Sequence, residues 1–290
     1  MPSSRAESAP LTDAWKDWVG RTEQRTDMAS AAPAAALAAT LDREDPGLLP
    51  GSALPPLRHW LHFTPRARQS EIGQDGHEKR GGFLPPVPLP RRMWAGGSLQ
   101  FDHPLRVDDE ITRASRIVSI EGRQGRSGEL VFVKLLHRIA SAEGTAVTEE
   151  QDIVYRGMPV PGAPEPAPLA APADEAFSRE IRPDPVMLFR YSALTFNGHR
   201  IHYDRDYVMR VEGYPGLVVH GPLIATLLLD LVDRERPDAR VHRFKFKAVR
   251  PLFDIHPFTV CGRSDGEGRL ALWARDHQGY LAMQAEAELL

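Results

Sequence analysis

The clearest pattern in the chain is one long apolar segment followed by four shorter segments of strand-like character. Residues 220–234 read HGPLIATLLLDLVDR, and their interior from Leu223 to Val232 is apolar on nearly every side, which predicts a fully buried helix. Glycine, proline or charged turns separate the segments that follow, which are predicted as strands over residues 241–249, 258–264, 270–276 and 280–288. A buried helix followed by a strand meander predicts an α+β fold, with the sheet wrapped around the helix.

The first half of the chain shows the same order of a helix before strands. An alanine-rich helix with a proline in its first turn is predicted over residues 31–42. Strands of an antiparallel sheet are predicted over residues 98–101, 113–121, 129–140 and 145–155. Four further segments have a less regular pattern. Residues 14–20 are predicted as a helix, 57–63 as a strand and 204–212 as a short helix. Residues 186–194 are predicted as a strand or as a strand that leads into a helix.

Two segments are too rich in proline and glycine for a regular element. Residues 65–97 predict no helix or strand, yet their aromatic side chains argue against disorder, and a long loop of this kind inside a compact domain indicates function. The proline- and alanine-rich segment 158–176 predicts a semi-extended linker. We therefore expect an N-terminal domain over residues 1–157 and a C-terminal domain over residues 177–290. The length of 290 residues also predicts about two domains.

Composition excludes several classes of protein. The chain is 42% hydrophobic and 26% charged with a net charge of -3, which gives no reason to expect nucleic-acid or membrane partners. No apolar stretch is long enough to span a bilayer. The N-terminus has no secretory hydrophobic segment. Cys261 is the single cysteine, which excludes an internal disulfide and a cysteine-based metal cluster. We expect a cytoplasmic protein.

The densest polar cluster lies just before the predicted buried helix. Residues 195–204 read TFNGHRIHYD, and the loop from Asn197 to His202 is short enough to turn both side chains toward one water molecule. The glycine-rich segment that follows ends in Gly221 and Pro222, at the predicted first turn of the helix. The free N–H groups there favour developing negative charge, which is the geometry of an oxyanion hole.

These residues resemble the catalytic signature of the MaoC-like hot dog hydratases and dehydratases, which act on acyl thioesters. In that family a serine-glycine-aspartate-x-asparagine-proline-isoleucine-histidine stretch precedes a histidine-glycine pair. The chain keeps Ile201, His202, Asp204 and the pair His220–Gly221. It differs at three positions, because Asn197 stands in place of the usual aspartate, His199 in place of the asparagine, and Arg200 in place of the proline.

A narrower group is also similar to this chain. TFNGHRIHYD, together with GGFLPPVPLPRRMWAGG in the first half, resembles the mesaconyl-C4-CoA (3-methylfumaryl-CoA) and itaconyl-CoA hydratases. The resemblance implies a double hot dog fold with two antiparallel sheets, each wrapped around a long central helix. It also implies an active site where the halves meet, with the catalytic residues in the second half. The reaction would add water to a branched C5 dicarboxylic enoyl-CoA to give citramalyl-CoA. No cofactor is expected, because CoA is part of the substrate.

Hydration of an unsaturated thioester needs a base, an acid and donors for the enolate oxygen. His202 suits the base role near neutral pH, the Gly221 N–H is the candidate oxyanion donor, and Asn197 can hold the water. An amide does not titrate, so the second proton carrier stays open. Either His202 carries the proton both ways, or another acid, such as His199 or Asp204, supplies it.

The substrate carboxylate needs a cationic partner, and arginine can bind it with two parallel hydrogen bonds. Arg91 and Arg92, beside Trp94 and flanking prolines, are the candidates, although surface charges would give the same pattern. The remaining candidate substrate contacts are His199, Tyr203 and Gly216. Lys245, Lys247 and Arg250 fit either CoA phosphates or a solvated strand face. The histidines at 199, 202 and 220 lack the acidic pattern of a zinc motif, so no metal is expected.

Three other functions fit parts of this pattern. A dehydratase for straight-chain 3-hydroxyacyl thioesters would need no arginine at the acyl end. An acyl-CoA thioesterase is a further alternative, since hot dog folds host both reactions, and the missing aspartate also allows a non-catalytic acyl-CoA binder. The expected partner in every case is an acyl-CoA thioester. Association of hot dog proteins through sheet edges favours a homodimer.

Overall fold

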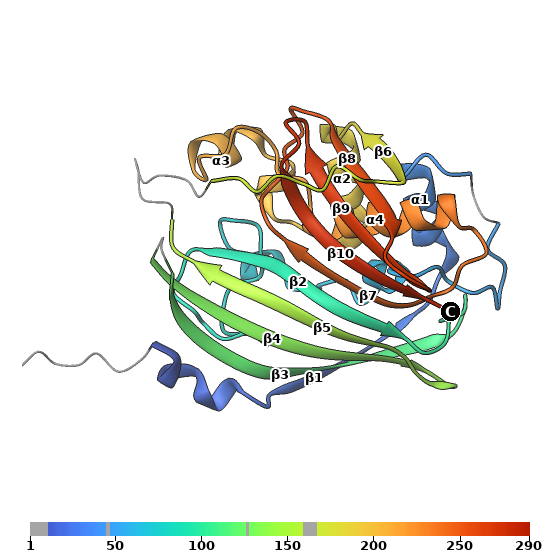
Figure 1. Ribbon diagram of the computed structural model, residues 1–290. Coiled ribbons are helices and arrows are strands. Elements are labelled where there is room, and N and C mark those ends of the chain that lie inside the picture. Colours follow the sequence, from blue (N-terminus) through green and yellow to red (C-terminus); the bar gives the residue numbers. More distant parts are fainter. Residues whose placement is uncertain (1–10, 45–46, 126–127, 159–166) are drawn as a thin grey trace, which may run out of the picture.

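A computed structural model describes residues 11–44, 47–125, 128–158 and 167–290 (Figure 1). The helices are α1 (Ala31–Thr40), α2 (Pro185–Thr195), α3 (Arg205–Arg210) and α4 (Gly221–Glu235). The strands of the first half are β1 (Thr22–Met28), β2 (Arg91–Phe101), β3 (Glu110–Gly125), β4 (Gly128–Ser141) and β5 (Gly144–Arg156). Those of the second half are β6 (Phe177–Ile181), β7 (Val241–Ala248), β8 (Phe258–Ser264), β9 (Arg269–Asp276) and β10 (Leu281–Leu289).

The described strands form a single antiparallel sheet in the order β1-β3-β4-β5-β2-β7-β10-β9-β8-β6. The two halves of the chain meet where β2 pairs with β7, from Gly96 opposite Lys247 to Gln100 opposite Arg243. The fold class is confirmed as α+β with two strand meanders. The expectation of two separate sheets needs correction, because hydrogen bonds between β2 and β7 join the meanders edge to edge.

Close packing explains why two glycines lie inside β2. A Cβ atom on Gly97 would stand 2.4 Å from the carbonyl oxygen of Glu150 on β5, and one on Gly96 would stand 2.6 Å from that of Phe246 on β7. Neighbouring backbones approach β2 too closely for side chains there. This strand begins at Arg91, so the predicted irregular segment 65–97 ends seven residues earlier than expected.

Helix α4 confirms the strongest prediction from the pattern. It is buried from Leu223 to Val232 and packs against β6, β8, β9 and β10. Helix α1 confirms the alanine-rich prediction, but it is only 10 residues long and packs against α2 (Figure 1). Its Leu37 belongs to the same hydrophobic core as the residues of α4. The two halves thus share one large core, beside a smaller core of the first half. Among the described residues, a long central helix is present in the second half alone.

A buried carboxylate on α4 ties the halves together. The Asp230 side chain is 2% exposed and accepts hydrogen bonds from Arg43 after α1, from Arg179 on β6 at 2.9 Å and from Arg234 at 2.8 Å. Three guanidinium groups compensate the cost of burying this charge. The ion-pair cluster therefore fixes the position of α4 against both halves.

Two local predictions were wrong, and a third was right about the helix but not about its type and start. Residues 57–63 contain the 3-10 helix Arg58–Leu61 instead of a strand, with Leu57 in the left-handed region at φ 66°. Residues 186–194 lie in helix α2, because the Asp184 side chain accepts the Met187 N–H at 2.7 Å and Pro185 occupies the first turn. The helix predicted at 14–20 is the 3-10 helix Leu11–Trp18. The short helix near 204–212 is confirmed as α3.

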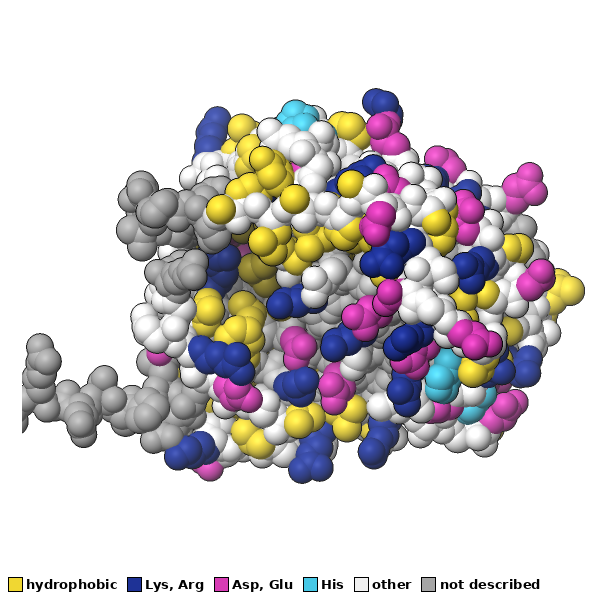
Figure 2. All heavy atoms as spheres, viewed as in Figure 1, with side chains coloured by type: hydrophobic (Ala, Val, Ile, Leu, Met, Phe, Trp, Pro, Cys, Tyr) yellow, Lys and Arg dark blue, Asp and Glu magenta, His cyan; other side chains and the backbone are white. Residues whose placement is uncertain are grey.

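The remaining general expectations concern domains and surface. Part of the predicted linker, residues 159–166, lies outside the described residues, so the division at 157 and 177 stays a prediction. No described helix is long and apolar enough to cross a membrane. Acidic and basic side chains are interspersed over the face shown in Figure 2. Cys261 is buried, and burial raises the pKa of its thiol to about 11.

Candidate active site

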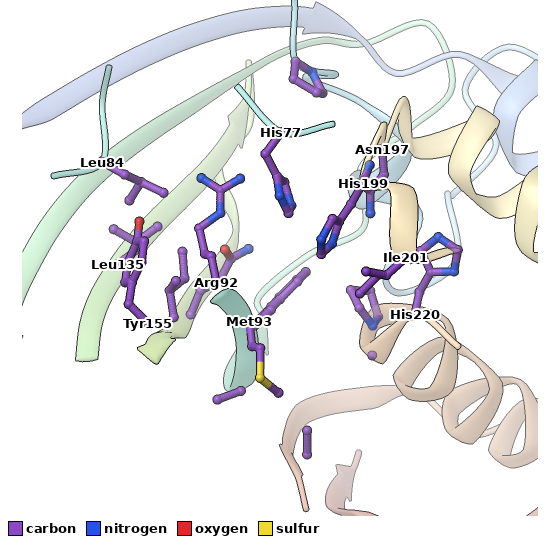
Figure 3. Close-up of a pocket in the computed structure, with 18 of the residues that line it drawn as sticks. His77, Leu84, Arg92, Met93, Leu135, Tyr155, Asn197, His199, Ile201 and His220 are labelled. Atoms are coloured by element: carbon purple, nitrogen blue, oxygen red, sulfur yellow. The ribbon is translucent and has the colours of Figure 1, made fainter. Parts of the chain in front are cut away.

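A cavity of about 550 Å³ lies between the two halves of the chain. Its first-half lining comes from the loop before β2 and from all five strands β1 to β5, including His77, Arg92, Trp94 and Tyr155. Its second-half lining includes Asn197, His199, His202 and Gly221. Figure 3 shows side chains from both halves pointing into this space. The expectation of a site where the halves meet is therefore matched by a cavity.

His202 is held as a neutral base. Its Nδ1 lies 2.7 Å from the carbonyl oxygen of Val218. A carbonyl can only accept, so Nδ1–H donates and Nε2 keeps its lone pair. The side chain is buried, and burial lowers the pKa of His202 to about 4. At neutral pH the ring is uncharged and able to take a proton.

The start of α4 completes the arrangement around His202. His220 is the N-cap, and its ring stacks on that of His202 with centroids 3.6 Å apart and planes at 17°. Nε2 of His220 lies 2.9 Å from Ser192 Oγ, which fixes the ring. Gly221 is the first helical residue, so its N–H has no carbonyl one turn earlier to bond. It lines the cavity beside His202, as an oxyanion donor must.

Asn197 also lines the cavity, just after α2. Its Oδ1 accepts the backbone N–H of His199 at 3.0 Å. The amide oxygen is therefore engaged in its own turn, and the NH₂ group is the part that can contact a ligand. His199 lines the cavity too, and its ring meets that of His202 at 5.4 Å in an edge-on contact. The structure thus brings residues 197, 199, 202 and 221 together.

The two adjacent arginines at the start of β2 have different surroundings. Arg91 is buried away from the cavity, with Nε 2.8 Å from Glu212 Oε2 and its guanidinium over the Tyr214 ring. Its charge is already compensated, and the structure does not bring Arg91 to the cavity as expected of a substrate-binding residue. Arg92 lines the cavity and forms no ion pair with another described residue.

The other expected substrate contacts divide in the same way. Trp94 lines the cavity, and its Nε1–H donates to the Gly96 carbonyl oxygen at 2.8 Å. Tyr203 does not line it. Its side chain is 45% exposed over a neighbouring hollow, and its hydroxyl donates to the carbonyl oxygen of Gly198. Gly216 is also absent from the lining. It packs closely on Asp254, because a Cβ on Gly216 would lie 2.8 Å from Asp254 Oδ1. The structure therefore does not bring these two residues to the cavity.

The basic residues suggested for CoA phosphates are only partly in place. Lys245 and Lys247 are exposed on β7 and do not line the cavity, as expected of a solvated strand face. Arg250 does line it, and its Nη1 lies 3.1 Å from Asp276. Asp204, one of the acids left open, caps α3 through Oδ1 and pairs with Arg200 through Oδ2. It does not reach the cavity.

Sequence reasoning missed two residues in the long first-half loop, Asp75 and His77. The Asp75 carboxylate lies 3.0 Å from His77 Nδ1. The loop docks on the segment around His199, where the Arg200 N–H donates to the Asp75 carbonyl oxygen at 2.9 Å. A Cβ on Gly76 would stand 1.8 Å from the Gly198 carbonyl oxygen, so only glycine allows this approach. The loop's length and composition were the only signals.

The same contact gathers three groups of metal-ligating type. Ligand atoms of Asp75, His77 and His199 all lie within 4.8 Å of one another. No sequence motif could show this set, because His199 is far along the chain from the other two. The hydrogen bond between Asp75 and His77 already gives these two residues a role without a metal, that of an oriented imidazole. The expectation of no metal stays a prediction.

The continuous antiparallel sheet, the buried α4 and the histidine cavity at its N-terminus define a double hot dog protein of the MaoC-like class. A MaoC-like dehydratase from Phytophthora capsici superposes with a TM-score of 0.71 at 14% identity, covering 93% of this chain and 95% of that one. A Mycobacterium tuberculosis protein described as a double hotdog fold has a TM-score of 0.58 at 13% identity, over 99% and 100% of the two chains. These likenesses show the fold.

The sequence places the chain more narrowly. The chain belongs to the hydroxyacyl-thioester dehydratase type 2 family, whose pattern matches residues 57–254. It is 48% identical over 278 residues to a mesaconyl-C4-CoA hydratase of Chloroflexus aurantiacus, covering 95% of this chain and 98% of that protein. The resemblance stated from the histidine signature is thus confirmed, and the chain is a hydro-lyase.

Proposed function

We propose that the protein adds water to mesaconyl-C4-CoA or itaconyl-CoA and forms citramalyl-CoA. The observation that carries the proposal is the cavity in which the free Nε2 of His202, the Gly221 N–H and the cationic Arg92 face one space. The identity of 48% to a protein named for this substrate supports the choice of acyl group.

The reaction on mesaconyl-C4-CoA follows from these groups. His202 Nε2 takes a proton from water as the water oxygen bonds to Cβ, the carbon that bears the methyl group and the carboxylate. The electron pair of the double bond moves toward the thioester oxygen, where the Gly221 N–H stabilises the developing charge. A proton delivered to Cα completes the addition. Asn197 positions the water through its NH₂ group.

The carboxylate end of the substrate has a matching pair of donors. Arg92 lies beside Tyr155 in the cavity (Figure 3). Tyr155 is fully buried, and its hydroxyl has no hydrogen-bond partner among the described residues. A buried donor without an acceptor is costly, and a substrate carboxylate would satisfy it together with the guanidinium. Burial raises the pKa of Tyr155, so the hydroxyl keeps its proton and donates.

The straight-chain dehydratase is the second candidate, and the family description favours it. Three CoA thioesters discriminate the two candidates through the loss of conjugated-thioester absorbance. They are mesaconyl-C4-CoA, 3-methylcrotonyl-CoA, in which a methyl group replaces the carboxylate, and crotonyl-CoA. We expect kcat/KM for mesaconyl-C4-CoA to exceed that for 3-methylcrotonyl-CoA by about 10²–10⁴. Faster turnover of crotonyl-CoA would instead assign the straight-chain reaction, and free CoA release would assign a thioesterase.

The proposal also covers the cofactor requirement, the oligomeric state and the cellular location of the protein. The substrate brings its own CoA, so no further cofactor takes part. A homodimer is proposed from the sheet edges of the fold and is tested by the mass of the native protein in solution. A cytoplasmic location is proposed from the sequence, and fractionation of the cells that make the protein tests it.

A further inference from the structure

The proposed hydration lacks an acid for Cα among the residues of the second half. Asn197 does not titrate, and both carboxylate oxygens of Asp204 are occupied outside the cavity. His199 lies in the cavity, but burial and the neighbouring His77 and His202 hold its pKa far below the usual histidine value. Its ring has no hydrogen-bonded carboxylate among the described residues to stabilise a protonated form, unlike the ring of His77. The missing acid must come from elsewhere in the cavity lining.

His77 of the first half has the surroundings that an acid needs. Its side chain is 21% exposed and lines the cavity, and Asp75 Oδ2 lies 3.0 Å from its Nδ1. A carboxylate at that nitrogen orients the ring and stabilises its protonated form. Nδ1 is thereby engaged, and Nε2 is the nitrogen left for a ligand. His202, in contrast, is backed only by a neutral carbonyl.

The two imidazoles are connected through a third. The rings of His77 and His199 have centroids 3.9 Å apart, and those of His199 and His202 lie 5.4 Å apart. Figure 3 shows His77 and His199 directed toward each other from different elements. Burial lowers the pKa of His202 most, and the nearby His77 adds to that lowering. Asp75 places a carboxylate at Nδ1 of His77, whereas Nδ1 of His202 faces a carbonyl, so only His77 has a partner that strongly favours the protonated ring.

We propose that His77, oriented by Asp75, is the acid that protonates Cα of the substrate while His202 acts as the base. The proposal rests on the proposed hydration. The water oxygen bonds to Cβ as His202 Nε2 takes its proton, and the double-bond electrons move onto the thioester oxygen. They return as Cα takes the proton of His77 Nε2–H. After the product leaves, His202 releases its proton to water and His77 takes one from water, which restores both residues.

The charges that face His77 connect this role to the substrate carboxylate. Burial lowers the pKa of His77, Asp75 opposes that shift, and Arg92 and Arg80 add to the lowering. His199 and His202 are the other titratable groups near it. A substrate carboxylate bound at Arg92 offsets the arginine charge, so binding raises the pKa of His77. A dicarboxylic acyl group therefore helps to protonate the acid that it needs.

The test compares His77→Gln and Asp75→Asn with His256→Gln, a control at an exposed histidine outside the cavity. We expect kcat of His77→Gln to fall by about 10²–10⁴ with little change in KM. Imidazole should restore part of the activity of a His77→Ala variant. Asp75→Asn should move the alkaline limb of the kcat profile to lower pH, because the protonated ring loses its carboxylate. Circular dichroism and melting temperature check that each variant folds.

Each measurement uses whichever of mesaconyl-C4-CoA and crotonyl-CoA the wild type hydrates faster, so the role of His77 is judged even if the substrate assignment fails. Near-wild-type kcat in His77→Gln, or an unmoved alkaline limb in Asp75→Asn, overturns the proposal. If EDTA abolishes wild-type activity and zinc restores it, Asp75, His77 and His199 are metal ligands, which also overturns it. Unchanged activity in EDTA, with imidazole rescue, supports it.

Discussion

Replacing Arg92 by methionine should change the substrate selectivity of the enzyme more than its stability. Arg92 lines the cavity and has no acidic partner among the described residues. A guanidinium can form two charge-assisted hydrogen bonds with a carboxylate. At about 1.5–3 kcal/mol for each, and with some loss of additivity, the variant should lose about 3–4 kcal/mol of transition-state stabilisation with mesaconyl-C4-CoA. Since 1.4 kcal/mol is tenfold, kcat/KM should fall by roughly 10²–10³.

The neighbouring arginine provides the matched control. Arg91 is 5% exposed and paired with Glu212, outside the cavity. Breaking such a buried pair costs about 3–5 kcal/mol of folding free energy. We expect Arg91→Met to lower the melting temperature while the ratio of kcat/KM for mesaconyl-C4-CoA and 3-methylcrotonyl-CoA stays as in the wild type.

The assay is the selectivity ratio itself, measured by absorbance of the conjugated thioester. Arg92→Met should lower this ratio because the neutral substrate never used the guanidinium. Tyr155→Phe should lower it by a smaller factor, since only one neutral hydroxyl donor is removed. An equal loss with both substrates in Arg92→Met would refute the reasoning, because Arg92 would then act on the reaction and not on the carboxylate.

Three further outcomes follow from the geometry. Burial lowers the pKa of His202 to about 4 in the folded protein, whereas the usual value in an unfolded chain is 6.5. Between these two pH values the unfolded chain binds a proton that the folded protein does not bind. The free energy of unfolding is therefore unaffected by His202 above pH 6.5 and falls by about 1.4 kcal/mol per pH unit as pH decreases toward 4. Urea unfolding at several pH values should show a shallower decline in His202→Gln. Gly221→Ala should have the melting temperature of the wild type, because its Cβ would lie 3.8 Å from the nearest atom, the Trp94 carbonyl oxygen. The added methyl group crowds the oxyanion donor, so kcat should fall by roughly 10²-fold. An unchanged kcat would show that Gly221 is not the oxyanion donor. Asp230→Asn should lower the free energy of unfolding by about 3 kcal/mol, the low end for a buried pair, because its arginines are partly exposed. Asp233→Asn, at an exposed carboxylate, should lower it by well under about 1 kcal/mol. Similar losses in both variants would contradict this account of the Asp230 cluster.

Elements with a strong local pattern could be predicted well. Helix α4 and strands β7 to β10 follow from periodicity and turn residues, because an element buried on one or all faces has apolar residues at regular or continuous positions in the sequence. The same holds for α1 and for β3, β4 and β5. Residues 57–63 and 186–194 were mistaken for strands because short apolar runs look alike in both states. The cap at Asp184 and the left-handed Leu57 decided them.

The second-half part of the site was predictable because its residues are close in sequence. Asn197, His202 and Gly221 lie within one loop–helix unit, so a short motif contains their spacing and their chemistry. The difference between Arg91 and Arg92 was not predictable. The two residues are adjacent, and the start of β2 and the direction of each face depend on pairing with β5 and β7.

Local physical chemistry, read along the chain, was enough for the buried helix, the strand meanders and the base with its oxyanion donor. The folded molecule alone decided that both meanders join into one sheet, that Arg92 and Tyr155 share the cavity, and that Asp75 and His77 reach His199. Those contacts join segments that are about 60 to about 150 residues apart in the chain. They arise from strand pairing and from the close approach of backbones at Gly76 and Gly96, and no periodic pattern in a linear sequence records which distant surfaces will meet.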